Sequence, residues 1–269
     1  MVKEMNTIEE IEIFAKDHFI PIARKQTVSF MIDLIKKNNY TSFFEIGTAI
    51  GYTSIILAKT FQGMKIHTIE HDLDRICIAR RNFEDFKVEK AINFIPGNAL
   101  TYETEEIFDL IFIDAAKKRN RYFLEKYLHN LSKGGSIIVD NMHLDDFWVG
   151  ANKDKKAHYD QVNEEFKEYL KNNPLYDVTF FDDIGDGIAL IKIKNVWFFQ
   201  TFFHYSGLYS NTGIYCNLNK LILCKWSIRC FFSGLGSIPS RMYLSNSSYV
   251  KPRLSSSVLP HNPSLGTLL

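Results

Sequence analysis

Polar side chains that could do chemistry stand at the predicted carboxyl ends of successive strands. They are Glu45, Glu70, Asn98, Asp114 and Asp140. In an open sheet with parallel strands these ends lie along one edge, and ligands bind at that edge. One acid in such a place can be a helix cap. Five in the same topological place favour a ligand site.

Two of these side chains suit an adenosine. Glu70 can accept hydrogen bonds from both hydroxyls of a ribose, and the side-chain oxygen of Asn98 can accept one from an adenine amino group. The alternative for Glu70 is a cap for the following helix. Gly47 and Gly51 form neither the dinucleotide fingerprint nor a phosphate loop. This absence favours S-adenosylmethionine over ATP or NAD as the bound cofactor. The alternative for the glycine turn is an ordinary connection between a strand and a helix, without a ligand.

A metal ion and a base are indicated next to each other. Asp114 and the pair Asp140-Asn141 end two strands that we expect to be neighbours. Oxygen ligands without His or Cys suit a hard ion such as Mg²⁺, which can hold a substrate hydroxyl and lower its pKa. Lys117 follows one short turn later, where a partly buried lysine can act as a base. The alternative is a solvated charge, since Lys117 belongs to the basic run 117–121.

The elements that would position these residues alternate along the chain. Apolar periodicity and turn residues predict helices at 8–18, 25–37, 73–86, 122–131 and 155–171, and strands at 65–70, 91–96, 107–114, 136–140, 176–181 and 188–194. A further strand begins at Phe43 and leads through the glycine turn into a helix that reaches Ala58. Such alternation gives a parallel sheet covered on both faces, and the last two strands form a hairpin.

Composition bounds the class of protein. Of the 269 residues, 46% are hydrophobic and 23% charged, as in globular proteins. No apolar run is long enough to cross a membrane, and residues 1–17 lack a signal-peptide core, so a cytoplasmic location is expected. The four cysteines form no C-x-x-C pair. Residues 1–195 carry 26 basic and 31 acidic side chains, which argues against indiscriminate nucleic-acid binding but allows a local basic patch.

The last part of the chain differs in composition. Residues 196–269 contain six basic and no acidic side chains, with many aromatic, Ser and Asn residues and no clear periodicity. We therefore predict a domain at 1–195 and an appended tail at 196–269. The tail is an interaction segment, a disordered segment, or sequence not normally translated in this frame, and the pattern assigns it no function.

The chain resembles the metal-dependent O-methyltransferase family that includes catechol and caffeoyl-CoA O-methyltransferases. The resemblance covers nearly all of 1–194 and rests on Glu45-Ile46-Gly47-Thr48-Ala49-Ile50-Gly51-Tyr52-Thr53, Ile69-Glu70, Ile113-Asp114-Ala115-Ala116-Lys117, Gly134-Gly135, Asp140-Asn141 and Gly185-Asp186-Gly187. It implies a Rossmann-like class I methyltransferase fold. That fold is a mostly parallel seven-stranded sheet with helices on both faces and a C-terminal antiparallel hairpin.

The resemblance also implies roles for individual residues. Mg²⁺ is held by Asp114, Asp140 and Asn141, and Lys117 is the catalytic base. S-adenosylmethionine is contacted by Ala23, Glu45, Gly47, Thr53, Glu70, Asn98, Ala99 and Asp114. The sequence departs from the family at Asn98, where Asp is usual, and at Asn120, where bacterial members often have Tyr bordering the active site. Since the family often forms dimers, a homodimer is expected.

Within the family the compact bacterial branch looks closest, and it includes the tRNA 5-hydroxyuridine methyltransferases, which make 5-methoxyuridine at the wobble position. The run 117–121 and Lys153, Lys155 and Lys156 could meet phosphates of a tRNA anticodon loop. Phe147 and Trp148 could stack on a base or form a lid over a small phenol. The alternatives are therefore a catechol or phenol O-methyltransferase and, in another class, a non-catalytic cofactor-binding protein that acts through its tail.

Overall fold

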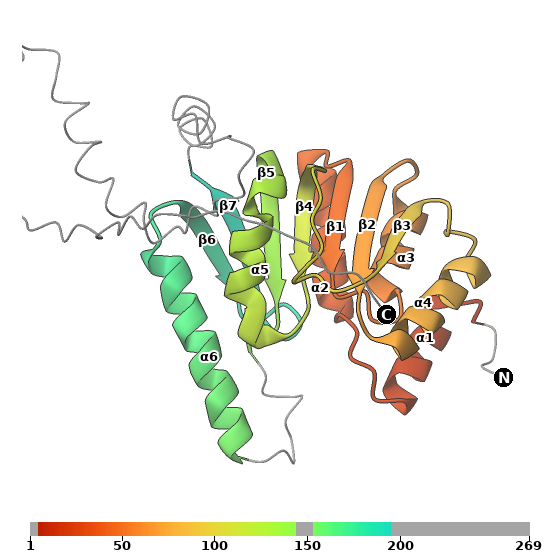
Figure 1. The fold of residues 1–269 in the computed structure, drawn as a ribbon, viewed down its shortest axis with the longest axis horizontal. Helices are drawn as coiled ribbons and strands as arrows, with labels where there is room; N and C mark the ends of the chain where they lie inside the picture. The colour runs from red at the N-terminus through yellow and green to blue at the C-terminus, as the bar shows by residue number, and fades with distance from the viewer. Residues whose placement is uncertain (1–4, 144–152, 195–269) are drawn as a thin grey trace, which may run out of the picture. The chain divides into compact units, whose positions relative to one another are not determined.

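Seven strands form one sheet in the order β3-β2-β1-β4-β5-β7-β6 in the computed structural model, which describes residues 5–143 and 153–194 (Figure 1). The strands are β1 (Ser42–Ile46), β2 (Lys65–Glu70), β3 (Ile92–Pro96), β4 (Phe108–Ile113), β5 (Leu131–Asp140), β6 (Tyr176–Phe181) and β7 (Ile188–Ile193). Strands β1 to β5 pair in parallel, and β7 is antiparallel to both of its neighbours. The mostly parallel sheet with a closing antiparallel hairpin is confirmed.

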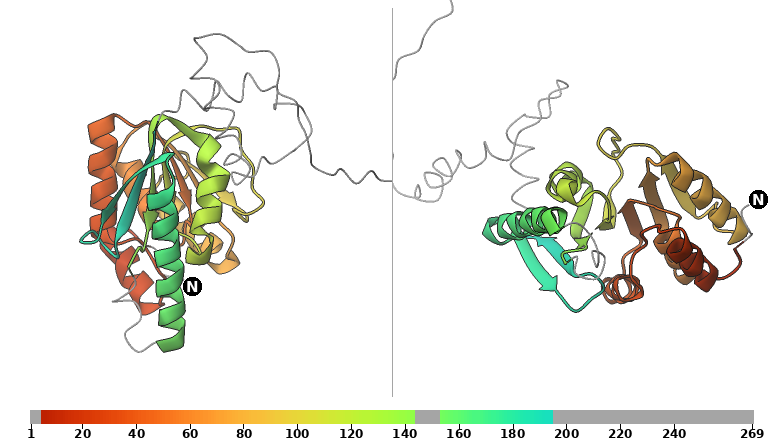
Figure 2. Two further views of the ribbon diagram at one scale, coloured as in Figure 1. Left: turned by 90° about the vertical axis from the view of Figure 1, so that its left-hand side faces the viewer. Right: turned by 90° about the horizontal axis from the view of Figure 1, so that it is seen from below.

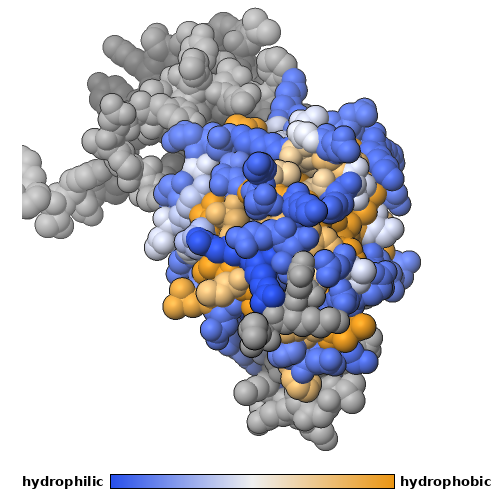
Figure 3. All heavy atoms as spheres, turned by 90° about the vertical axis from the view of Figure 1, so that its right-hand side faces the viewer, coloured by the Kyte–Doolittle hydropathy of each residue, from blue (hydrophilic) through white to orange (hydrophobic). Residues whose placement is uncertain are grey.

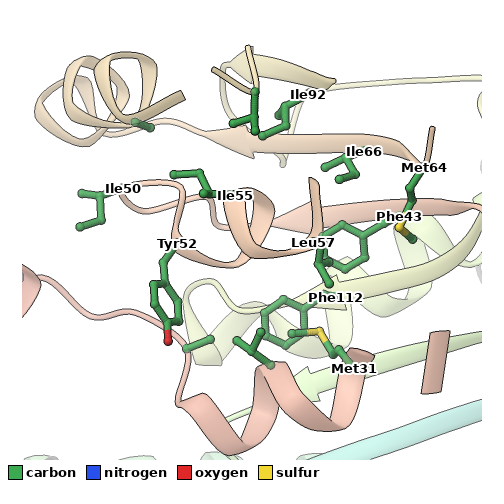
Figure 4. Close-up of a cluster of buried hydrophobic side chains, with 14 of the residues drawn as sticks. Met31, Phe43, Ile50, Tyr52, Ile55, Leu57, Met64, Ile66, Ile92 and Phe112 are labelled. Atoms are coloured by element: carbon green, nitrogen blue, oxygen red, sulfur yellow. The ribbon is translucent and has the colours of Figure 1, made fainter. Parts of the chain in front are cut away.

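Helices cover both faces of this sheet, as predicted (Figure 2). They are α1 (Ile8–Asp17), α2 (Lys25–Asn38), α3 (Tyr52–Thr60), α4 (Leu73–Asp85), α5 (Asn120–Tyr127) and α6 (Lys153–Asn172), with two short 3-10 helices, η1 (Lys117–Arg119) and η2 (Leu128–Asn130). Helices α1 to α4 share one core with Phe43 and Phe112, and α5 and α6 share the other with Phe44 and Ile113. Figure 4 shows the part of the first core between α2, α3 and the sheet. Consecutive strand residues face opposite sides, so each strand serves both cores.

The start of β5 differs from the prediction. The helix expected at 122–131 ends at Tyr127, and β5 begins at Leu131 rather than after Gly134-Gly135. The two glycines lie within the strand, where the pairing of β4 with β5 is shifted and Gly134 has a φ of 83°. A Gly-Gly pair indicates a backbone that can adopt unusual dihedral angles, and such angles occur at strand irregularities as well as in turns.

The carboxyl ends of β1 to β5 meet along one edge of the sheet. Helix α1 and the N-terminal half of α6 extend past that edge (Figure 1). On the side of the molecule that carries α4, apolar atoms lie in separate patches among hydrophilic ones (Figure 3). No helix in 5–143 or 153–194 is long and apolar enough to cross a membrane.

Candidate active site at the carboxyl ends of the strands

The turn between β1 and α3 requires two glycines. Gly47 has a φ of 107°, and a Cβ there would lie 2.1 Å from the carbonyl oxygen of Asp114 at the end of β4. Gly51 has a φ of 89° and stands before the first turn of α3, where a Cβ would lie 2.6 Å from the ring of Phe83. Main-chain atoms therefore line this turn, beside the N–H groups of a helix start, which is a suitable place for a polar ligand.

Glu70 fixes this turn from the end of β2. One carboxylate oxygen accepts from the main-chain N–H of Ala49 at 2.9 Å, and the other accepts from His71 at 2.9 Å and Asp72 at 3.0 Å. Helix α4 is capped by Asp72, whose side chain accepts from Arg75 N at 3.0 Å. Asp72 therefore fills the capping role considered for Glu70. The Glu70 carboxylate, with one oxygen bonded to the glycine turn, is in the place expected for a ribose-binding acid.

Glu45 lies beneath the turn in a buried network of hydroxyls. Its Oε2 accepts from the hydroxyls of Ser54 and Thr68, both at 2.6 Å, and Thr48 bonds to Thr68 at 2.7 Å. Burial raises the pKa of Glu45 to about 7, although the hydrogen bonds from Ser54 and Thr68 oppose the rise. Thr53, predicted to contact the cofactor, is 3% exposed and also interacts with Glu45. The network supports the turn from below, and cofactor contact by Glu45 remains a prediction.

The other predicted cofactor contacts lie around the same edge. Asn98 is exposed after β3, and its side-chain oxygen accepts from Leu100 N at 2.9 Å, which leaves a second lone pair for a ligand. The carbonyl of Ala99 accepts from the hydroxyl of Tyr127 at 2.7 Å. Ala23 is buried in the segment between α1 and α2.

Asp114 and Asp140 end two adjacent strands, as predicted from the sequence. Asp140 is 3% exposed, and neither of its carboxylate oxygens has a hydrogen-bond partner among the described residues. Burial and the neighbouring Asp114 raise the pKa of Asp140 to about 8, although the nearby main-chain N–H of Asn141 and the Lys117 ammonium act in the opposite direction. Burial also raises the pKa of Asp114, while the Lys117 ammonium acts in the opposite direction. Two such acids close together are stabilised by positive charge, which a proton, the Lys117 ammonium or a metal ion can supply.

The oxygen donors predicted at these strand ends are of the kind that Mg²⁺ prefers. The two carboxylates stand at the ends of adjacent strands, and Asn141, the third predicted ligand, directly follows Asp140 with a left-handed backbone, φ 63°. Within 5–143 and 153–194 no three or more His, Cys, Asp and Glu side chains form a metal-binding group. A site with two carboxylates and one amide, in which other positions are filled by water or substrate oxygens, is typical of Mg²⁺ rather than of Zn²⁺.

Lys117 is the half-buried member of the basic run. It begins η1, and burial lowers its pKa while Asp114, Asp140 and Asp186 act in the opposite direction. Lys118, by contrast, is exposed. Its partial burial and lowered pKa therefore distinguish Lys117 from a solvated surface charge.

Asp186 was not among the site residues proposed from the sequence, although its motif was recognised. It lies between β6 and β7, and it interacts electrostatically with Lys117 and both strand-end acids. Arg24 Nε donates to both of its carboxylate oxygens, at 3.1 and 2.9 Å. The two flanking glycines were the available signal. A Cβ on Gly187 would lie 2.5 Å from the ring of His143, and one on Gly185 would lie 2.4 Å from a side chain of α2.

Some predicted substrate contacts cannot be placed in this geometry. Phe147 and Trp148 lie outside the described residues, as do the side chains of Lys153 and Lys155. Asn120 is buried at the start of α5.

The fold and this site define a class I methyltransferase, with a glycine turn after β1 and an acid at the end of β2. The sequence model of the O-methyltransferase family matches residues 3–194, and the chain belongs to that family. The resemblance recognised in the sequence is thereby confirmed, and the protein is an S-adenosylmethionine-dependent O-methyltransferase. The alternative of a non-catalytic protein is not supported.

Three similar proteins illustrate the relationship. A catechol O-methyltransferase of Niastella koreensis is 28% identical over 166 residues, which are 57% of this chain and 73% of the relative. A structure from Staphylococcus aureus with the provisional name caffeoyl-CoA O-methyltransferase is 30% identical, with a TM-score of 0.63 over 71% of this chain and 93% of the other. An O-methyltransferase from Bacillus cereus in complex with S-adenosylhomocysteine is 25% identical, with a TM-score of 0.59 over 72% and 93%.

Proposed function

We propose that the protein moves a methyl group from S-adenosylmethionine to a substrate hydroxyl with Mg²⁺ held by Asp114, Asp140 and Asn141. One observation carries the proposal. The buried carboxylate of Asp140, without a hydrogen-bond partner among the described residues, stands beside a second acid and a half-buried lysine. A buried carboxyl group without a hydrogen-bond partner is costly, whether it is charged or protonated, so a purely structural role does not account for Asp140.

The protein residues divide the work between the two substrates. The glycine turn and Glu70 orient the cofactor, and the bound ion supplies a Lewis acid that lowers the pKa of the acceptor hydroxyl. Lys117, whose pKa is lowered by burial, accepts the hydroxyl proton at Nζ. Bound S-adenosylmethionine would supply the methyl group to the resulting oxyanion, and its sulfur would leave as the thioether of S-adenosylhomocysteine. Much of the acceleration comes from holding the two reacting atoms in contact.

The proposed acceptor is 5-hydroxyuridine at the wobble position of tRNA. The charge beside Lys117 supports this choice, because Lys118 and Arg119 are exposed on η1, whereas the exposed Arg121 is paired with Glu125 at 2.9 Å. The Lys118 ammonium lies 5.5 Å from the ring centre of Tyr159 on α6. Cations and aromatic rings beside a reaction centre suit an anticodon loop, in which phosphates position the RNA and a base is presented singly.

A small catechol or phenol is the second candidate. It is favoured by the catechol O-methyltransferase relative and by the acidic charge balance of residues 1–195. A tRNA substrate would place the reaction in the cytoplasm. We also propose a homodimer, which sedimentation analysis at several protein concentrations would test.

The test of the acceptor is mass spectrometry of tRNA nucleosides from a strain that lacks the gene. Loss of 5-methoxyuridine with accumulation of 5-hydroxyuridine is expected, and the purified protein should restore the modification with S-adenosylmethionine and Mg²⁺. An unchanged nucleoside profile, together with methylation of catechol in vitro, would replace tRNA by a small phenol as the substrate.

A further inference from the structure

An ion pair joins two parts of the candidate site that are far apart in sequence. Arg24 Nε donates to both carboxylate oxygens of Asp186, at 3.1 and 2.9 Å, across 162 positions of the chain. The Asp186 side chain is 18% exposed and that of Arg24 is 45% exposed. A surface pair of this kind contributes little to folding stability. Its role therefore depends on the two segments that it connects.

Arg24 belongs to the cofactor side of the site. It directly follows Ala23, which is buried and is a predicted cofactor contact, and it precedes the first turn of α2. Lys25, the next residue, pairs with Glu12 of α1 at 2.7 Å. The other oxygen of Glu12 accepts from the hydroxyl of Tyr52, at 2.7 Å, on the first residue of α3. The segment that carries Arg24 is therefore tied to the helix that starts at the glycine turn.

Asp186 belongs to the acceptor side. Its main-chain carbonyl accepts from His143 N at 2.8 Å, and the carbonyl of Gly187 accepts from Met142 N at 2.9 Å. These bonds hold the β6–β7 loop against the segment that directly follows Asp140-Asn141. The carboxylate of Asp186 also acts on Lys117. The Asp186 side chain is therefore hydrogen-bonded to Arg24 and lies near enough to Lys117 to act on its pKa.

We propose that Asp186 is a positioning residue and that the Arg24–Asp186 pair clamps the cofactor-side segment to the acceptor-side loop. The clamp holds the methyl carbon and the acceptor oxygen at their reacting distance. Neither member touches the reacting atoms; Asp186 acts through Lys117 and the loop, and Arg24 acts through the segment of Ala23. The inference rests on the proposed roles of Ala23, Lys117 and Asp140. Because a misplacement of about 1 Å can cost about 100-fold in rate, the pair would affect turnover more than binding.

The test compares Asp186→Asn with Asp183→Asn. The control removes an exposed charge from the same loop. Turnover is measured with a 5-hydroxyuridine anticodon stem-loop and with catechol, and cofactor affinity by calorimetry with S-adenosylhomocysteine. For Asp186→Asn we expect kcat to fall by about 10- to 100-fold, with KM and cofactor affinity within about 3-fold of the wild type. Asp183→Asn should keep the wild-type kcat.

Variants of Arg24 provide a second test, which is still possible if the Asp186→Asn variant folds poorly. Arg24→Gln should lose a similar factor in kcat, and Arg24→Lys, which restores a cation, should recover part of it. If the two residues act as one clamp, the double variant Arg24→Gln/Asp186→Asn loses no more than the larger single loss, because coupled residues are not additive.

Three results would overturn the clamp. The first is a wild-type kcat for both Asp186→Asn and Arg24→Gln. The second is losses that multiply in the double variant. The third is a loss of kcat matched by equal losses of cofactor affinity and thermal stability, which indicates a structural role. Failure of the proposed function would be seen differently, as full turnover of Asp140→Ala and Lys117→Met.

Discussion

Lys117 can be separated from its exposed neighbour by a single pair of variants. Burial lowers the pKa of Lys117, so its amine loses its proton at a lower pH than an ordinary lysine does. Turnover should therefore rise with pH up to that lowered pKa. Lys117→Met keeps the bulk of the stem and should lower kcat by about 100-fold or more, with cofactor binding retained and the pH dependence lost. Rates are measured against pH for both proteins.

The matched control for this variant is Lys118→Met, which neutralises the adjacent exposed charge. It should keep normal turnover, with at most a salt-sensitive weakening of tRNA binding. Small and equal effects of the two substitutions would remove Lys117 from the mechanism.

Asp140 tests the metal site independently of the base. Its buried oxygens have no hydrogen-bond partner in the described structure, so Asp140→Ala should remove the metal site and the transfer while leaving cofactor binding measurable. Calorimetry with Mg²⁺ alone gives a readout that does not depend on activity. Full turnover of the wild type in the presence of a chelator would rule out the metal mechanism.

Candidate site residues at strand ends were easier to predict than the residues that support them. Glu70 and the Asp114–Asp140 pair could be located because each ends a strand, and the topology of an open sheet brings such ends together. The hydroxyls of Ser54 and Thr68 gave no such signal, since their role depends on which side chain they meet across the turn. Asp186 was missed for the same reason, because its contact with Arg24 depends on how two distant loops meet.

The free energy of unfolding of the protein should depend on pH through Glu45, the buried acid beneath the β1–α3 turn. Its folded pKa of about 7 lies above its ordinary value of 4.5, so the folded protein keeps the proton longer than the unfolded chain. The contribution of Glu45 to stability is therefore complete below about pH 4.5 and is lost as the pH rises through about 7. The expected loss is about 3 kcal/mol.

Glu45→Gln removes this titration and keeps a hydrogen-bond acceptor in the network. The free energy of unfolding of the wild type, relative to that of the variant, should fall by about 3 kcal/mol between pH 4.5 and pH 7.5. Urea denaturation at both pH values measures it. A difference that stays constant with pH would mean that Glu45 is ionised throughout, held so by its two hydroxyl donors.

The bounds of helices and strands were predictable where the apolar pattern is clear along the sequence. The prediction was wrong where pairing with a neighbouring strand determines the bound. The strands at 65–70 and 176–181 were located to the residue, because apolar side chains and flanking polar residues mark both ends. The start of β5 was placed five residues late. Whether Gly134-Gly135 forms a turn or an irregular strand depends on its pairing with β4, which lies outside the local sequence.

The charge of the chain is divided unevenly between its two predicted parts. The formal net charge is +1 for the full sequence and −5 for residues 1–195, because the last 74 residues carry six basic and no acidic side chains. If residues 196–269 contribute to RNA binding, they do so mainly through charge, and their contribution should weaken steeply with salt. Catalysis on a small acceptor should not depend on them.

A chain that ends at Asn195 should therefore fold and bind S-adenosylmethionine as the full chain does. Its physical basis is the end of the sheet, since β7 ends at Ile193 and the main-chain N–H of Lys194 donates to the carbonyl of Leu175 at 2.8 Å. The O-methyltransferase match also ends at 194. Thermal melting and calorimetry compare the two lengths, and tRNA affinity is measured at two salt concentrations. A shortened chain that melts without cooperativity or fails to bind the cofactor would place part of the domain beyond residue 195.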